Sequence, residues 1–274
     1  MLKGTTPTGC AGTTRRLLRY VAATAAVLAV GAVPAVVSAA PTVEVTGRAV
    51  PIPGFPHTGN ILGAGAAVEA QVKISGTEYG GYPAPLIGVT VYLPVGVKLD
   101  TRDFPTCPAK VILEESAPER CPKGSSAGPT GKVEGVVAFG GERVEETAEI
   151  RSFFAPGGGL EFLVDGHTPV SLEIPTSARL LQPGGGGGFG PEFVTTVPLV
   201  ETVPGAPDAS AEAIDIKLGS AIRKHGKVFY YGRVPKSCPK GGFRVKSVFT
   251  FAENADLGMP DTVTVPFRAP CPSK

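Results

Sequence analysis

The chain has 274 residues with 26 basic and 24 acidic side chains, 37 glycines, 28 prolines and no tryptophan. Residues 1–39 contain four of the basic side chains and no acidic one, which leaves 22 − 24 = −2 as the formal charge of residues 40–274. This balance excludes nucleic acid as an expected partner and gives no support for an anionic membrane surface. The abundance of glycine and proline indicates a fold rich in turns.

Residues 1–39 have the pattern of a helical signal peptide. Basic side chains that begin with Lys3 precede an apolar stretch over 21–33, and small residues follow it. We expect cleavage between Ala39 and Ala40, and hence a secreted or cell-envelope protein. The alternative is an uncleaved anchor, because 20–40 carries no charge and is long enough to cross a bilayer. A membrane is expected as a partner only in that case.

Cysteine usage supports an oxidising compartment. Cys10 lies in the signal segment, and each of the other four precedes a proline: Cys107, Cys121, Cys238 and Cys271. An even number in an exported chain predicts disulfides, for which three connectivities exist. Proximity and the shared Cys-Pro pattern favour 107 with 121 and 238 with 271. The absence of a C-x-x-C pair and of histidines at ligand spacing leaves no predicted metal or cofactor site.

Alternation of apolar and polar residues predicts about eleven strands and no amphipathic helix of ordinary length. The clearest strand covers 66–75, with Val68, Ala70, Val72 and Ile74 on one face. Other strands are expected at 42–46, 89–93, 132–139, 143–154, 160–164, 168–174, 214–218, 228–231, 243–251 and 263–267. A slip of the alternation near Ser247 predicts a bulge. Gly140-Gly141 and Asp165-Gly166 are each expected to form a hairpin turn.

These elements predict an all-β fold, an antiparallel β-sandwich or jelly roll stapled by disulfides and covering 40–274. Five consecutive glycines at 184–188 indicate a flexible loop or linker. The alternative is therefore a pair of half-domains, 40–183 and 191–274, joined by this run.

Two surface sites are candidates for ligand contact. Tyr79 and Tyr82, separated by two glycines, are placed to stack on a sugar ring, although a chain without tryptophan is poorly supplied for this. Arg223 and Lys224 lie in a basic stretch suited to a phosphate, a sulfate or a wall polyanion. The simpler interpretation of the basic stretch is a solvated hairpin tip.

The string 124–128 matches the G-x-S-x-G pattern of hydrolases, with Ser126 at the nucleophile position. Prolines and a cysteine flank it, however, so neither the preceding strand nor the following helix that the motif needs is available. Asp165 and His167 are explained by a turn. No catalytic residue is predicted.

The segments LPVGVKLD, FPTCPA and CPKGSSAG, together with CPKGGF and APCP near the C-terminus, resemble secreted β-rich proteins of high-GC Gram-positive (actinobacterial) soil bacteria. No activity and no functional residues come with this resemblance. The expected function is that of a secreted, non-catalytic binding or structural module, with a cell-wall polysaccharide or another envelope protein as partner. The alternative is an exported hydrolase whose active site the sequence does not reveal.

Overall fold

The computed structural model describes residues 40–55, 61–182, 187–253 and 260–272. The predicted signal peptide, with Ala39, lies outside this range, and so do the first three residues of the glycine run, 184–186. Ala40 is the first described residue, and it is exposed.

Eleven strands form one antiparallel sheet in the order β1-β2-β10-β5-β6-β7-β8-β9-β3-β14-β15. Their bounds are β1 (Thr42–Val50), β2 (Ala67–Ser75), β3 (Leu86–Tyr92), β5 (Gly131–Phe139), β6 (Glu142–Phe154), β7 (Leu160–Thr168), β8 (Leu172–Leu181), β9 (Glu192–Thr196), β10 (Ser210–Leu218), β14 (Phe243–Glu253) and β15 (Pro260–Ala269). Two small sheets pair β11 (Ala221–Lys224) with β12 (Lys227–Tyr230), and β4 (Lys98–Leu99) with β13 (Gly232–Arg233). The helices are α1 (Ala109–Leu113) and the short turns η1 (Pro118–Arg120) and η2 (Pro156–Gly158).

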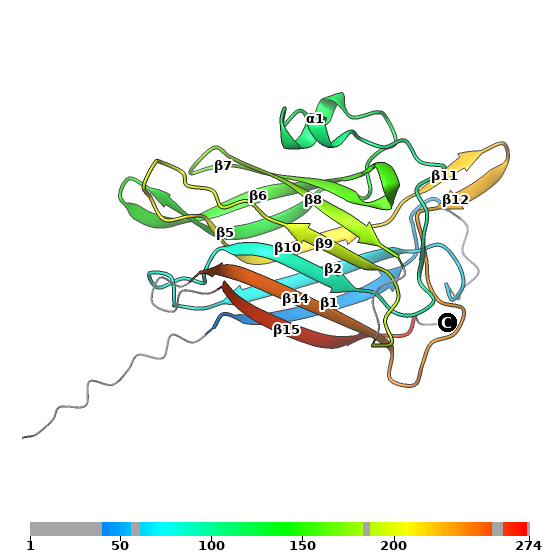
Figure 1. The fold of residues 1–274 in the computed structure, drawn as a ribbon. Coiled ribbons are helices and arrows are strands. Elements are labelled where there is room, and N and C mark those ends of the chain that lie inside the picture. Colours follow the sequence, from blue (N-terminus) through cyan, green and yellow to red (C-terminus); the bar gives the residue numbers. More distant parts are fainter. Residues whose placement is uncertain (1–39, 56–60, 183–186, 254–259, 273–274) are drawn as a thin grey trace, which may run out of the picture. The chain divides into compact units, whose positions relative to one another are not determined.

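The large sheet curls until its first and last strands lie side by side, which nearly closes it into a barrel (Figure 1). At this seam Gly47 of β1 faces Phe267 of β15, and a Cβ added to the glycine would lie 3.4 Å from the ring. No ladder pairs these two strands among the described residues. Pro266 on β15 suits an edge position, because proline has no N–H to offer to a neighbouring strand.

The all-β class is confirmed, but the strands form one curled sheet rather than the two packed sheets of a sandwich. The curvature has local causes on β5 and β10. A Cβ at Gly131 or Gly135 would lie 2.4 or 2.3 Å from a backbone oxygen of β10, so only glycine allows the two strands to approach this closely. A register shift between Ala211 and Ala213 bends β10 at the same place. Strands on both sides of the glycine run belong to this one sheet, since β8 pairs with β9.

The two predicted hairpin turns had different outcomes. Gly140 and Gly141 have φ of 62° and 88° and join β5 to β6, as a primed turn requires. The turn predicted at Asp165-Gly166 is wrong, because β7 continues through both residues to Thr168. Gly166 is instead needed for space, since a Cβ there would lie 2.9 Å from a carboxylate oxygen of Glu146.

That carboxylate organises the actual turn. Glu146, which is buried, accepts hydrogen bonds from the backbone N–H groups of Thr168 (3.0 Å) and Val170 (3.1 Å). The chain therefore reverses after Thr168, around a cis peptide bond to Pro169. An acidic side chain distant in sequence thus fixes the position of the β7–β8 turn.

The bulge predicted near Ser247 is also misplaced. Alternate side chains of β14 remain inward, and Ser247 is one of them, at 3% exposure. The register shift relative to β3 lies between Thr250 and Phe251. The apparent break in the period is a polar residue, Ser247, on the inner face of β14.

Both predicted disulfides are confirmed: Cys107 bonds to Cys121, and Cys238 bonds to Cys271. The first fastens the segment with α1 onto the outer face of β6 and β7, where Ile112, Phe153 and Leu163 form a buried cluster with it. The second ties the chain after β15 to the loop before β14. Two such bonds are typical of an oxidising environment.

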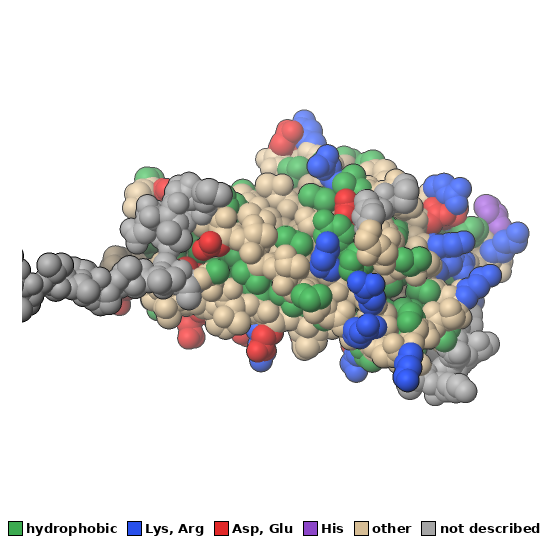
Figure 2. Space-filling view, turned by 60° about the horizontal axis from the view of Figure 1, so that its bottom comes forward, with side chains coloured by type: hydrophobic (Ala, Val, Ile, Leu, Met, Phe, Trp, Pro, Cys, Tyr) green, Lys and Arg blue, Asp and Glu red, His purple; other side chains and the backbone are tan. Residues whose placement is uncertain are grey.

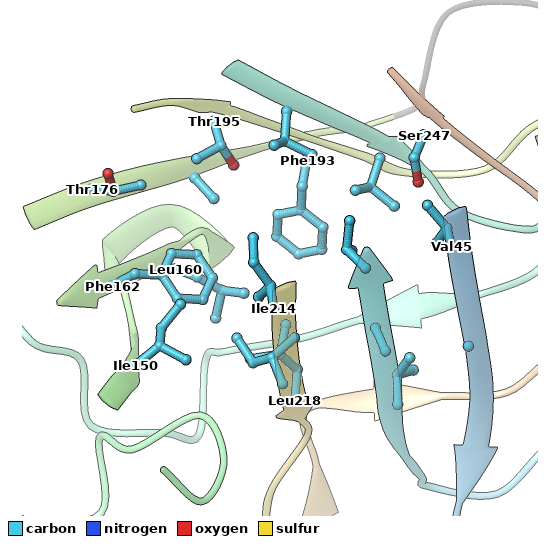
Figure 3. Close-up of a pocket in the computed structure, with 18 of the residues that line it drawn as sticks. Val45, Ile150, Leu160, Phe162, Thr176, Phe193, Thr195, Ile214, Leu218 and Ser247 are labelled. Carbon is cyan, nitrogen blue, oxygen red and sulfur yellow. The ribbon is translucent and has the colours of Figure 1, made fainter. Parts of the chain in front are cut away.

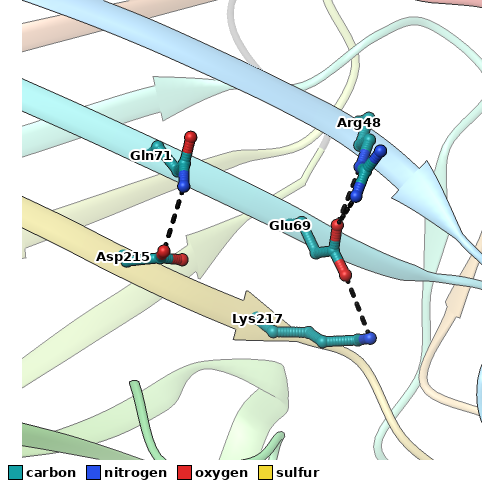
Figure 4. A network of polar contacts seen from close by, with 5 residues as sticks. All are labelled: Arg48, Glu69, Gln71, Asp215 and Lys217. Carbon is teal, nitrogen blue, oxygen red and sulfur yellow. Dashed lines mark hydrogen bonds and ion pairs between the residues drawn. The ribbon is translucent and has the colours of Figure 1, made fainter. Parts of the chain in front are cut away.

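The outer face of β1, β2 and β10 is polar. Glu69 accepts hydrogen bonds from Arg48 (2.8 Å) and Lys217 (3.1 Å), and Gln71 donates to Asp215 (3.0 Å; Figure 4). The hydrogen bond from Arg48 holds the pKa of Glu69 below its usual value, with a further contribution from Lys217. Polar side chains outside and apolar ones inside are what the period of two predicted.

Candidate ligand-binding cavity

The barrel encloses an apolar cavity of about 430 Å³. Successive side chains of a strand point to opposite faces, so each strand sends alternate apolar residues into the same space. Val45, Ile150, Phe162, Phe193 and Ile214 show how different strands converge there (Figure 3). The lining is dominated by valine, leucine, isoleucine, phenylalanine and alanine.

The inner face of β2 shows that this space is not filled by side chains. Val68, Ala70 and Val72 line the cavity, yet Val68 remains 45% exposed. Barrels of about eight strands have just enough side chains to fill their interior or to hold one small ligand, and the interior widens as strands are added. An eleven-stranded sheet with inward valines and alanines therefore leaves room for a guest molecule.

A few hydroxyl groups interrupt the apolar wall formed by β8, β9 and β14. Thr176, Thr195 and Ser247 lie along it (Figure 3). Thr176 is 7% exposed, and its Oγ1 has no hydrogen-bond partner in the described part of the chain. A buried hydroxyl without a partner costs folding free energy, and this oxygen is itself sealed from the cavity.

Aromatic side chains close part of one end of the barrel. The ring of Phe154 lies 4.8 Å from that of Phe104 and 4.6 Å from that of Tyr231, between centroids. Burial raises the pKa of Tyr231, whose hydroxyl donates to the carbonyl of Gly158 (3.4 Å). Tyr231, the single residue between β12 and β13, lines the cavity, so this cluster forms part of the cavity wall.

The tyrosines proposed for sugar stacking hold an arginine in this structure. Tyr79 and Tyr82 both lie against the guanidinium of Arg143, at 5.1 and 4.7 Å from ring centroid to Cζ. Arg143 also donates to the carbonyl of Tyr79 (2.7 Å) and to Oγ of Ser210 (2.9 Å). No sequence pattern indicates this partner, which is 61 residues from Tyr82 and is brought to it by the sheet order β2-β10-β5-β6.

The candidate anion-binding pair lies on the β11–β12 hairpin. Arg223 lies over the ring of Phe55, at 5.6 Å from the centroid, and Lys224 donates to the carbonyl of Asp103. His225, with φ of 50°, forms the turn between the two strands. Both cations are exposed, and neither is among the residues that line the cavity.

The residues of the hydrolase alternative are placed as follows. Ser126 donates its hydroxyl hydrogen bond to the carbonyl of Gly128 (2.6 Å) in the loop beside Phe153. Asp165 and His167 lie together on the outer face of β7, with 3.3 Å between Oδ1 and Nε2, and Arg151 pairs with the same aspartate at 2.8 Å. No hydrogen bond or ion pair among the described residues joins Ser126 to this pair.

Within the described ranges, no group of three or more His, Cys, Asp or Glu side chains is placed to hold a metal ion. The helices of the described residues include none that is long and apolar enough to span a membrane. No protein-family model, curated protein or solved structure matches the chain.

Proposed function

We propose that this protein is an exported, non-catalytic binding protein that holds one apolar small molecule, such as a fatty acyl chain, inside the barrel. The observation that carries the proposal is the cavity of about 430 Å³ with its apolar wall. Ligand sites are typically 300–1,000 Å³ and mostly apolar, with a small number of polar groups that orient the ligand.

The energetics favour an extended hydrocarbon. Each buried methylene group contributes about 0.8 kcal/mol of transfer free energy, so ten of them offset much of the cost of immobilising a ligand. A rigid polar sugar would leave most of its hydroxyl groups unsatisfied against valine and leucine side chains.

Export rests on three supports: the signal pattern of residues 1–39, the two disulfides, and the resemblance to secreted actinobacterial proteins. Outside the cell, a carrier of this kind would keep a poorly water-soluble apolar compound in solution by burying it.

The absence of tryptophan from the chain makes a direct binding assay possible. Phe193→Trp places a single fluorophore in the cavity wall, and Phe189→Trp places one near the outward-facing ring of Tyr92 as the matched control. We expect dibromostearate to quench the first variant and spare the second, with unbrominated stearate competing.

A cavity-filling change completes the test. Ala70→Phe adds volume to the inner face of β2 and is expected to weaken binding at least tenfold. If dibromostearate quenches both tryptophans equally, or if Ala70→Phe binds as well as the parent while remaining folded, the cavity is not the ligand site.

A further inference from the structure

One end of the barrel carries a concentrated positive charge. Six exposed basic side chains, from segments that the sheet brings together, carry this charge. We call them the basic rim: Lys98, Arg233, Lys236, Lys240, Arg244 and Arg268. Lys98 pairs with Arg233 across β4 and β13, and Arg244 pairs with Arg268 at the adjoining ends of β14 and β15. The hairpin with Arg223 and Lys224 extends the same surface (Figures 1 and 2).

Few acidic groups offset this charge. Asp100 is paired with Arg102, whose hydrogen bond lowers the pKa of that carboxyl group. Among the described residues, Asp103 follows β4, Glu192 begins β9, and Glu69 near the start of β2 is paired with Arg48 and Lys217. Because the paired and partly buried acids are outnumbered, the rim presents a net positive field to solvent.

The other end of the barrel is acidic. Glu142 and Glu145 lie in and beside the β5–β6 turn, Glu173 lies near the start of β8, and Glu201 faces Asp208 in the loop before β10. Burial and the charge of Glu201 raise the pKa of Asp208. In Figure 2 the basic side chains gather over one half of the visible face and most of the acidic ones lie over the other. The net charge of −2 therefore conceals a strong separation of charge along the barrel.

Apolar features coincide with the basic rim. Val95, at the tip of the turn after β3, is 63% exposed, and the neighbouring Pro94 and Val97 line the cavity. Arg233 and Pro235 line it from the other side of the same end. The opposite end also exposes apolar side chains, Leu199, Val203 and Phe139, but these lie beside acidic residues, Glu201 and Glu142.

We propose that the basic rim docks on an anionic lipid bilayer, with Val95 entering the headgroup region. Cationic side chains next to exposed apolar ones are the combination that binds an anionic interface, where electrostatic attraction and apolar burial add. A soluble polyanion would use the charges but would leave Val95 and the adjoining apolar lining unexplained. This proposal goes beyond cavity binding, which stands without it.

The test is co-sedimentation of residues 40–274 with vesicles of two compositions. One is pure phosphatidylcholine, and the other is phosphatidylcholine with 30 mol% phosphatidylglycerol. The parent protein is expected to bind the anionic vesicles only, and to lose binding as salt is raised. Lys98→Gln/Lys236→Gln/Lys240→Gln removes three rim charges. Since each basic residue near an anionic surface contributes about fivefold, we expect a loss on the order of 100-fold.

The matched control is Lys73→Gln/Lys110→Gln/Lys132→Gln, which changes the net charge equally but on the outer faces of β2, α1 and β5. It is expected to keep parent affinity. Val95→Ser is expected to weaken binding several-fold, whereas Val203→Ser at the acidic end leaves it unchanged. Equal loss in the two triple variants, or no binding by the parent, would overturn the proposal. Binding to soluble polyglycerol phosphate but not to vesicles would overturn it in favour of a wall polymer.

Discussion

The guanidinium of Arg143 lies over the ring of Tyr82, with 4.7 Å between its Cζ and the ring centroid. Tyr79 lies on the same cation at 5.1 Å and accepts a hydrogen bond from it through its carbonyl oxygen. Tyr79 also accepts a hydrogen bond at its hydroxyl from the backbone N–H of Asp208 (3.3 Å). The arginine therefore joins β6 to the turn at 77–82 and, through that turn, to the loop before β10.

Arg143→Lys tests this connection. Lysine keeps the charge but cannot hydrogen-bond to the Tyr79 carbonyl and Ser210 Oγ while lying over two rings. We expect a loss of about 1–2 kcal/mol in the free energy of unfolding, measured by urea denaturation. Arg244→Lys is the control, because that exposed arginine meets a single ring at 5.3 Å and its replacement is expected to cost less than about 0.5 kcal/mol. Equal effects would show that Arg143 is an ordinary surface cation.

The Glu146 carboxylate leads to a second prediction. Each of its oxygens accepts one backbone N–H from the β7–β8 turn, so Glu146→Gln leaves one N–H facing an amide donor. A buried donor without an acceptor costs about 1–3 kcal/mol, and we expect a loss of that size. The exposed neighbour Glu145→Gln is expected to leave stability unchanged, and amide hydrogen exchange at Thr168 and Val170 is expected to rise in the first variant alone. Unchanged exchange would contradict the assignment.

Period-two patterning predicted most strands of the large sheet and their inner faces. It missed β9, and the strand predicted at 168–174 covers the β7–β8 turn and only the start of β8. The face predicted for β2 is the one that turns inward, with Val68, Ala70 and Val72 on the cavity and Ile74 in the core. Alternation says which face is apolar, but not whether it meets a second sheet or the far wall of its own sheet. That distinction depends on Gly131, Gly135 and the shift in β10, whose effects appear only when the strands are paired.

Neither the cavity nor the basic rim could be predicted from the sequence, for a related reason. Inward valines look the same in a filled core and around a space, because residue type does not give the distance between opposite walls. Net charge, likewise, is a sum without positions: Arg244 and Arg268 are 24 residues apart in the chain and face each other in the sheet. Arg143 is likewise distant in sequence from Tyr79 and Tyr82, although it lies against both of their rings.

Loop length alone is not expected to decide how much stability each disulfide contributes. The entropic model gives about 3 kcal/mol for the bond spanning 14 residues and about 3.8 kcal/mol for the one spanning 33. Cys107, however, is fully buried against Ile112 and Leu163, so its removal also takes packing from the core. We expect Cys107→Ala/Cys121→Ala to lose at least as much stability as Cys238→Ala/Cys271→Ala, both measured by denaturation. A loss in proportion to loop length would show that the packing around Cys107 adds nothing.

Glu161 predicts a pH dependence with a definite sign. It lies on the outer face of β7, which α1 contacts; it is 2% exposed, and its Oε2 has no partner in the described residues. Burial raises the pKa of Glu161 above 4.5, while a hydrogen bond with Ser177 opposes that shift. A raised pKa in the folded state means that ionisation costs stability, so the protonated carboxyl group stabilises the fold at low pH and this contribution is lost as pH rises through the folded value.

Glu161→Gln removes that titration while keeping the shape of the side chain. The stability of the variant relative to the parent is expected to increase between pH 4 and pH 7, where the parent has to ionise a buried group. Glu69→Gln provides a control of opposite sign, because the pKa of Glu69 is lowered, chiefly by its hydrogen bond to Arg48, and its contribution is lost as pH falls. The measurement is the urea midpoint of the three proteins across this pH range. If the stability of Glu161→Gln relative to the parent stays constant or falls as pH rises, the ionised form of Glu161 does not destabilise the fold at neutral pH.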